Sequence, residues 1–190
     1  MKKGPRDGAG AGQDTGVAPW RRRLRASLWD LVPIWGCLGG VGAAGGLLSL
    51  CRINPFPRLF ANAATADLTS FALTVLPAGV LLSGAEAGGS AASWGKRRTG
   101  LRVVDHAGEP PGIARAALRN AIKLAGWQVA HLGLLRVTGA TGRRPRTRAI
   151  GSALLCGAYL VSAADLAPAL LRADGRALHD LAAGTRVVTR

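Results

Sequence analysis

The chain contains three long apolar runs separated by polar, mostly basic segments. The runs cover about residues 28–51, 68–86 and 149–171, and each holds a single charged residue. Because a helix of about 20 apolar residues crosses the hydrocarbon of a bilayer, each run is long enough to span one. The pattern predicts an all-α integral membrane protein.

The segment 113–137 has a different, amphipathic pattern. At 100° per residue one half of such a helix is apolar, and the other half carries Arg115, Arg119, Asn120, Lys123, Trp127 and His131. This helix fits two placements: flat at the membrane interface, or across the membrane with its polar face toward the interior of a bundle.

Two short β-branched segments bear on that choice. Residues 101–104 (Leu-Arg-Val-Val) and 185–188 (Thr-Arg-Val-Val) are similar strands that can pair. Pairing requires both on one side of the membrane, which holds if 113–137 crosses. We predict a small bundle of three to four transmembrane helices, with an amphipathic third helix and a short cytoplasmic two-strand element.

The chain divides into a tail and one membrane domain. Residues 1–19 are rich in Gly, Ala, Asp and Pro without apolar periodicity, which predicts a disordered tail. Residues 20–190 form the predicted transmembrane domain. The first apolar run exceeds the ~7–15 residues of a signal-peptide core, so an uncleaved first helix is expected.

The net positive charge of the chain bears on the kind of partner that it binds. The net charge of +15 is typical of a nucleic-acid-binding protein, but 48% of the residues are hydrophobic, 5% are aromatic, and the basic residues lie between the apolar blocks. That arrangement predicts contact with an anionic lipid leaflet and no nucleic-acid partner.

The distribution of Lys and Arg also predicts the topology. Seven of them precede the first span and two, Arg52 and Arg58, lie in the first loop, so a multi-pass plasma-membrane protein with a cytoplasmic N-terminus is expected. A fourth span would place the basic loop 143–148 outside, against this rule.

The first apolar run is rich in glycine. Gly36/Gly40 and Gly42/Gly46 are small-xxx-small pairs, which allow helix backbones to approach closely in lipid. They predict a homo-oligomer.

Three acids lie within or at the edge of apolar runs: Asp30, Glu86 and Asp165. A carboxylate at membrane depth usually faces a partner or a pathway. Two interpretations follow. Glu86 and Asp165 line a transport route, or they pair with Arg119 or Lys123, beside Asn120, and hold a polar core together.

Three motifs occur in order along the chain. The first joins Arg23 to Asp30, seven residues later on the same helix face. The others are Gly95 to Asp105 (GKRRTGLRVVD) with a later Arg119-Asn120, and residues 178–188 (LHDLAAGTRVV).

Together these motifs resemble the RDD family of small bacterial membrane proteins over roughly residues 20–190. On this resemblance the family arginine is Arg23, the first aspartate Asp30 and the second Asp180, with Asp105 as the alternative. The chain departs at Ser93-Trp94, where many members have Thr-Pro.

The segment Gly95-Lys96-Arg97 invites a phosphate-loop interpretation, which fails because positions 90 and 97 are Ser and Arg. It is predicted instead to be a basic juxtamembrane loop at anionic lipid. No nucleophile–base pair, metal-ligand spacing or cofactor loop is found, so we expect no enzyme, cofactor or metal.

Two functions remain. The resemblance implies transport of a small solute or cation through a charged helix-bundle core, with the solute unspecified. The alternative is a non-transporting structural or accessory protein that binds anionic lipid or a partner protein.

Overall fold

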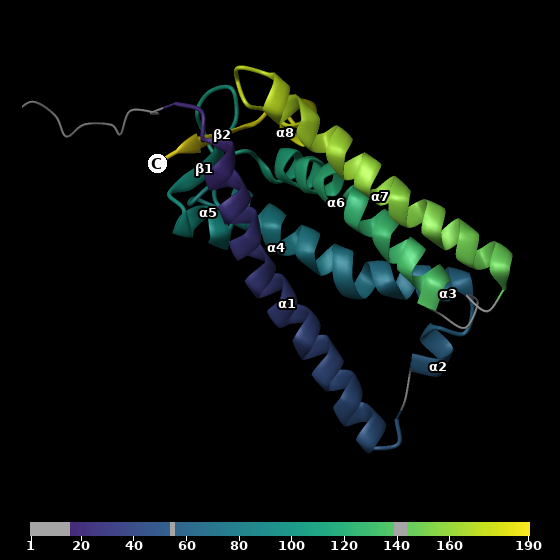
Figure 1. Ribbon diagram of the computed structural model, residues 1–190. Coiled ribbons are helices and arrows are strands. Elements are labelled where there is room, and N and C mark those ends of the chain that lie inside the picture. The colour runs from purple at the N-terminus through teal and green to yellow at the C-terminus, as the bar shows by residue number, and fades with distance from the viewer. Residues whose placement is uncertain (1–15, 54–55, 139–143) are drawn as a thin grey trace, which may run out of the picture.

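The computed structural model describes residues 16–53, 56–138 and 144–190. Four long helical passes run between two ends of the molecule, and a small cap closes one end (Figure 1). The cap consists of helix α5 (Trp94–Arg98), strand β1 (Leu101–Val104), helix α8 (Leu178–Ala182) and strand β2 (Arg186–Thr189). The prediction of a helical membrane bundle with a two-strand element is confirmed.

The first pass is α1, Trp20–Leu50, 31 residues long. At 1.5 Å per residue it extends about 46 Å, well beyond the ~30 Å hydrocarbon of a bilayer. The basic segment before the apolar run therefore continues the helix into the cap. Among the described residues, no atom outside the helix approaches the position of an added Cβ at Gly36, Gly40, Gly42 or Gly46 within 4 Å.

The second pass, Ala63–Ala87, is a continuous helix made of three consecutive segments. After α2 (Phe56–Leu59), helix α3 (Ala63–Ser70) is capped by Asn62, one π-helical turn covers Phe71–Val75, and α4 (Leu76–Ala87) completes the pass. The wide turn precedes Pro77, whose ring lacks an N–H and would clash in a regular helix.

The third and fourth passes are α6 (Ile113–Thr138) and α7 (Pro145–Leu171), which lie side by side. Glycine permits this contact: a Cβ at Gly126 would meet Ser162 Oγ at 2.3 Å, and one at Gly133 would meet the carbonyl of Gly151 at 2.8 Å. The amphipathic segment predicted at 113–137 is one long helix. The last helix begins at Pro145, four residues before the apolar run that was predicted to start at residue 149.

The pairing of the two strands is also confirmed. They are antiparallel with Val103 opposite Val187, and the second strand is displaced by one residue from the predicted range. Val17 makes an isolated bridge to Val188, so the end of the predicted tail is fixed to the cap. Residues 1–15 of that tail lie outside the described part of the chain.

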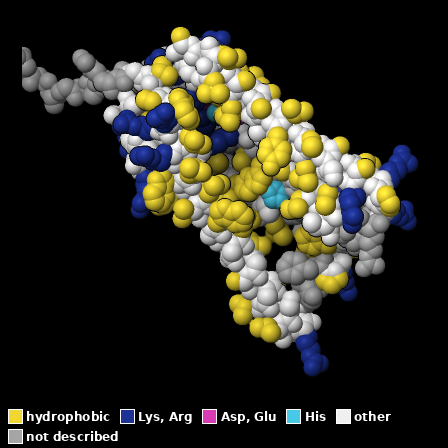
Figure 2. All heavy atoms as spheres, in the orientation of Figure 1, with side chains coloured by type: hydrophobic (Ala, Val, Ile, Leu, Met, Phe, Trp, Pro, Cys, Tyr) yellow, Lys and Arg dark blue, Asp and Glu magenta, His cyan; other side chains and the backbone are white. Residues whose placement is uncertain are grey.

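On the face shown in Figure 2, apolar side chains cover most of the surface between the ends, and Lys and Arg lie mainly toward the ends. Three helical passes, Trp20–Leu50, Ala63–Ala87 and Pro145–Leu171, are long and apolar enough to cross a membrane. Within the bundle, α1, α4 and α6 meet through Ile34, Leu82 and Leu124. These features define a membrane protein whose polar interior lies at the capped end.

Candidate functional site

A buried charged cluster lies where the four passes meet the cap, and Arg119 of α6 is at its centre. The side chain of Arg119 is 2% exposed. Its Nη1 donates to both carboxylate oxygens of Glu86 at 2.9 and 3.1 Å, and its Nε donates to Asp180 Oδ1 at 3.0 Å. One guanidinium therefore binds α4 and α8 to α6.

Two further bases complete the charged cluster, which we define as Arg23, Glu86, Lys96, Arg119 and Asp180. Lys96 Nζ donates to Glu86 Oε1 at 2.7 Å, and Arg23 of α1 pairs with Asp180. Because both acids are completely buried, these contacts supply the compensation that a buried carboxylate requires.

The interpretation of the 95–97 segment as an exposed basic loop is wrong for Lys96. The segment is helix α5, and Gly95 and Lys96 are buried. Lys96 turns inward because Glu86 offers an acceptor inside the molecule, whereas Arg97 stays exposed. Asn120 contributes beside them, donating to Glu86 Oε2 at 3.1 Å.

Asp30 is engaged separately from the charged cluster. It accepts hydrogen bonds from Ser93 Oγ and from the backbone N–H of Gly95, both at 2.7 Å. These bonds fix α1 to the start of α5. Ser93 keeps the hydroxyl of the more usual Thr, and Trp94, in place of Pro, packs edge-to-face on Trp29 with ring centroids 5.6 Å apart.

Asp165 has a partner that the sequence did not indicate. Its carboxylate accepts from His179 Nδ1 at 2.6 Å and from the His179 N–H at 2.9 Å. Of the two interpretations of these acids, pairing with Arg119 or Lys123 does not hold for Asp165, because α8 places His179 between this acid and Arg119. Glu86 does pair with Arg119.

The neighbours of His179 define its protonation state. Arg119 Nη2 lies 3.3 Å from Nε2, and because a guanidinium has only donors, Nε2 accepts while Nδ1 donates to Asp165. Burial, reinforced by the positive charge of Arg119, lowers the pKa of His179. Although burial opposes its charge, the positive charges of Arg119 and Arg23 hold the pKa of Asp180 well below its ordinary value.

Acid is therefore expected to destabilise the fold in two stages. The unfolded chain protonates His179 near its ordinary pKa of 6.5, while the folded state resists this proton, so stability falls as pH decreases through that value. The contribution of Asp180 is complete above its ordinary pKa of 3.8 and is lost below it. Thermal unfolding in detergent between pH 8 and pH 3 measures both stages.

The matched variant for this prediction is His179→Asn, which keeps a donor toward Asp165 but does not titrate. It should lack the first stage and keep the second. A wild-type protein whose unfolding temperature rises as pH falls from 7 to 5 would contradict the assignment of a neutral His179.

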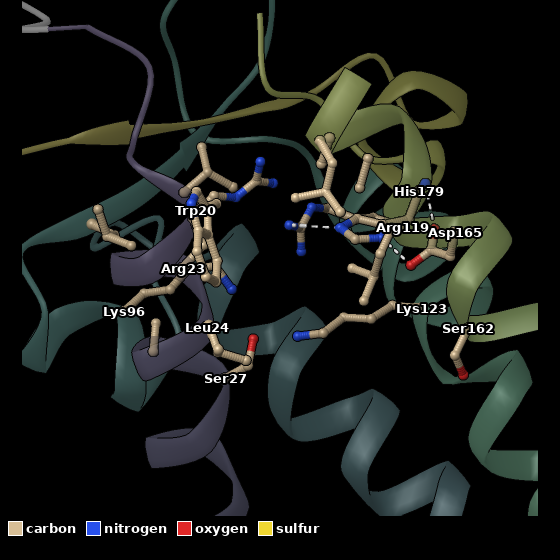
Figure 3. Close-up of a pocket in the computed structure, with 17 residues that line it drawn as sticks. Trp20, Arg23, Leu24, Ser27, Lys96, Arg119, Lys123, Ser162, Asp165 and His179 are labelled. Atoms are coloured by element: carbon tan, nitrogen blue, oxygen red, sulfur yellow. Dashed lines mark hydrogen bonds and ion pairs between the residues drawn. The ribbon is translucent and has the colours of Figure 1, made fainter. Parts of the chain in front are cut away.

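A cavity of about 500 Å³ lies against the charged cluster, between α1 on one side and α6, α7 and α8 on the other (Figure 3). Lys and Arg side chains are visible in the hollow between the upper parts of α1 and α7 (Figure 2). Its basic lining residues are Arg23, Lys96, Arg119 and Lys123. Lys123 points into this space, and its ammonium has no hydrogen-bond or ion-pair partner among the described residues (Figure 3).

The structure thus joins residues that the sequence placed far apart, and it separates others. Arg23 and Arg119 both contact Asp180, and Arg119 also contacts Glu86, whereas Asp30 contacts α5 instead. Asp105, the alternative for the second aspartate, lies in a partly exposed turn and pairs with Arg115 at 3.3 Å. Among the described residues, no group of three His, Cys, Asp or Glu side chains is arranged to hold a metal ion.

The fold and this site define a small helical membrane protein with a polar cap and a buried ion-pair network at the capped end. The chain belongs to the RDD family, whose model matches residues 17–184. Comparison with curated proteins finds no match, and comparison with solved structures finds none either.

Proposed function

We propose that this membrane protein carries a small solute across the bilayer and that the cavity beside the charged cluster is the solute site. The observation that carries the proposal is the cavity itself, about 500 Å³ in volume and lined by charged side chains at the end of a membrane bundle. A concave site with a few convergent polar groups is the usual form of a small-ligand site.

We further propose that the protein lies in the plasma membrane, that α6 crosses it as a fourth helix, and that the cap lies on the cytoplasmic side. Close contacts of Gly126 and Gly133 with α7 support the crossing, because a helix packed along a transmembrane neighbour extends through the same depth. The basic residues before the first span support a cytoplasmic cap. Under this topology both described ends of the chain lie on the cytoplasmic side.

A route for cations along the membrane acids has less support. Asp30, Glu86 and Asp165 each accept hydrogen bonds from donors of the same chain, so their carboxylate oxygens are already occupied. Because four helices are few for a carrier, we also propose that the glycine-rich part of α1 joins two or more copies. The open space around its glycines supports this.

The proposal is tested by flux into proteoliposomes. Gradients of sodium, potassium, protons, chloride and phosphate are applied to wild-type protein and to Ala169→Phe, which adds bulk at the cavity wall without changing a charge. Ala164→Phe on the exposed side of the same helix is the matched control. We expect at least one flux above that of empty vesicles, reduced about tenfold by Ala169→Phe and unchanged by Ala164→Phe.

Either of two outcomes would contradict the proposal of transport. In one, wild-type vesicles conduct nothing under any gradient. In the other, a flux is present but is insensitive to Ala169→Phe in protein that is folded.

The second candidate is a structural or accessory membrane protein, and a specific observation favours it. The acids of the polar interior are all used within the chain, as a network that only positions helices would require. Absence of flux together with retained binding of an anionic lipid or a partner protein would support this candidate.

A further inference from the structure

The lining of the cavity beside the charged cluster has two chemically distinct halves. One half carries the ammonium and guanidinium groups already described. The other is apolar and comes mainly from α1 and α7, with Leu24, Leu166 and Leu170 among its members. These three side chains are 53%, 54% and 68% exposed, so the apolar half is continuous with the surface between the two helices.

The basic half has an unsatisfied charge. Arg23, Lys96 and Arg119 are already paired with acids of the charged cluster. Lys123 has no such partner among the described residues; Lys96 and Arg119 repel it, while Glu86 and Asp30 attract it without contact. An anion in the cavity would supply the missing partner.

The acidic residue that lines the cavity does not fill this role. Both carboxylate oxygens of Asp165 accept hydrogen bonds from His179. In Figure 3 the Lys123 ammonium extends toward α1, on the side of Leu24 and Ser27 and away from Asp165. The space in front of Lys123 is thus available to a ligand.

We propose that the cavity binds an anionic phospholipid, with its phosphate at Lys123 and an acyl chain leaving between α1 and α7 along Leu24, Leu166 and Leu170. This goes beyond the proposed function, because it assigns a membrane lipid to the same cavity and does not depend on solute transport. A phosphate supplies acceptor oxygens for an ammonium, and the chain covers apolar surface that a small hydrated anion leaves exposed. Trp20 lines the cavity beside them, and tryptophan is typical of the membrane–water interface.

The test measures lipid retention by delipidated protein in detergent, using native mass spectrometry. Phosphatidylglycerol, phosphatidylcholine and inorganic phosphate are added separately. We expect one phosphatidylglycerol per chain to bind at least about tenfold more tightly than phosphatidylcholine, with no displacement by phosphate alone at equal concentration.

Variants distinguish this cavity from the general basic surface. Lys123→Met should weaken phosphatidylglycerol binding about tenfold or more, and Lys123→Arg should largely retain it. Arg22→Met removes one positive charge from an exposed position at the same end of the molecule, and it should leave the bound lipid in place. Ala169→Phe, which keeps every charge, should also prevent binding, so the test does not depend on Lys123→Met folding normally.

Equal binding of the two phospholipids, or binding unaffected by both Lys123→Met and Ala169→Phe, would overturn the proposal. Displacement of lipid by inorganic phosphate alone would overturn the phospholipid assignment in favour of a soluble phosphate ligand. The result separates this inference from transport: lipid binding without flux removes the carrier function only, and flux without lipid binding removes the lipid site only.

Discussion

Replacing Arg119 with methionine is expected to destabilise the protein by about 3–5 kcal/mol, the usual result of removing one partner from a buried ion pair. The reason is that Glu86 and Asp180 would remain buried with fewer hydrogen-bond donors to their carboxylates. Both are completely buried, and each loses charge-assisted hydrogen bonds of 2.9 to 3.1 Å. Lys96 and Arg23 still contact these acids, but α6 no longer joins α4 to α8.

Unfolding in detergent by urea or heat measures this effect, and Arg115→Met is the matched control. Arg115 lies one turn earlier on the same helix, is half exposed and pairs with Asp105 at 3.3 Å, so its loss should change stability by about 0.2–1 kcal/mol. Similar losses for the two variants would show that the buried network is not what holds α6 to the cap.

Gly95→Ala is expected to have the second largest effect, a loss of about 3 kcal/mol or more. An added Cβ would lie 2.0 Å from the carbonyl oxygen of Ala26 and 2.9 Å from the backbone nitrogen of Asp30. Because these are backbone atoms of a long helix, α5 has to move away from α1. Overpacking costs about 1–3 kcal/mol, and loss of the N–H that Gly95 donates to Asp30 adds about 1–3 kcal/mol.

Gly84→Ala in α4 provides a control with the opposite sign. No described atom outside its own helix lies within 4 Å of an added Cβ there, so the substitution should stabilise the helix by roughly 0.5–1 kcal/mol. Unfolding measured under the same conditions compares the two. If Gly95→Ala proved as stable as the wild type, the close contact of α5 with α1 would be wrong.

Much of the fold could be predicted because hydropathy and helix periodicity are local properties. The apolar runs predicted the three spans, and the similarity of residues 101–104 to 185–188 predicted their pairing. The partners of the acids were harder to predict. The sequence offered several basic residues as possible partners of Asp165, and His179 is its partner because α8 packs beside this acid.

The same limit explains the error at Lys96. A run of three bases beside an apolar span normally stays in water at the lipid surface, and nothing in the run itself marks one member as buried. One signal was present in the sequence: Lys96 lies only ten positions after the membrane acid Glu86, to which it donates. Only the approach of α5 to α1, which glycine permits, turns Lys96 inward.

The order of residues along the chain was enough to predict the class of protein, the three apolar spans, the amphipathic character of 113–137 and the residues of the family motifs. Which of those residues contact one another depends on the tertiary structure. Arg119 and Asp180 are 61 positions apart in the chain, and Arg23 and Asp180 are 157 apart. Such contacts depend on how distant helices cross and dock, and the cost of burying a charge without a partner then fixes each pairing once the helices are in place.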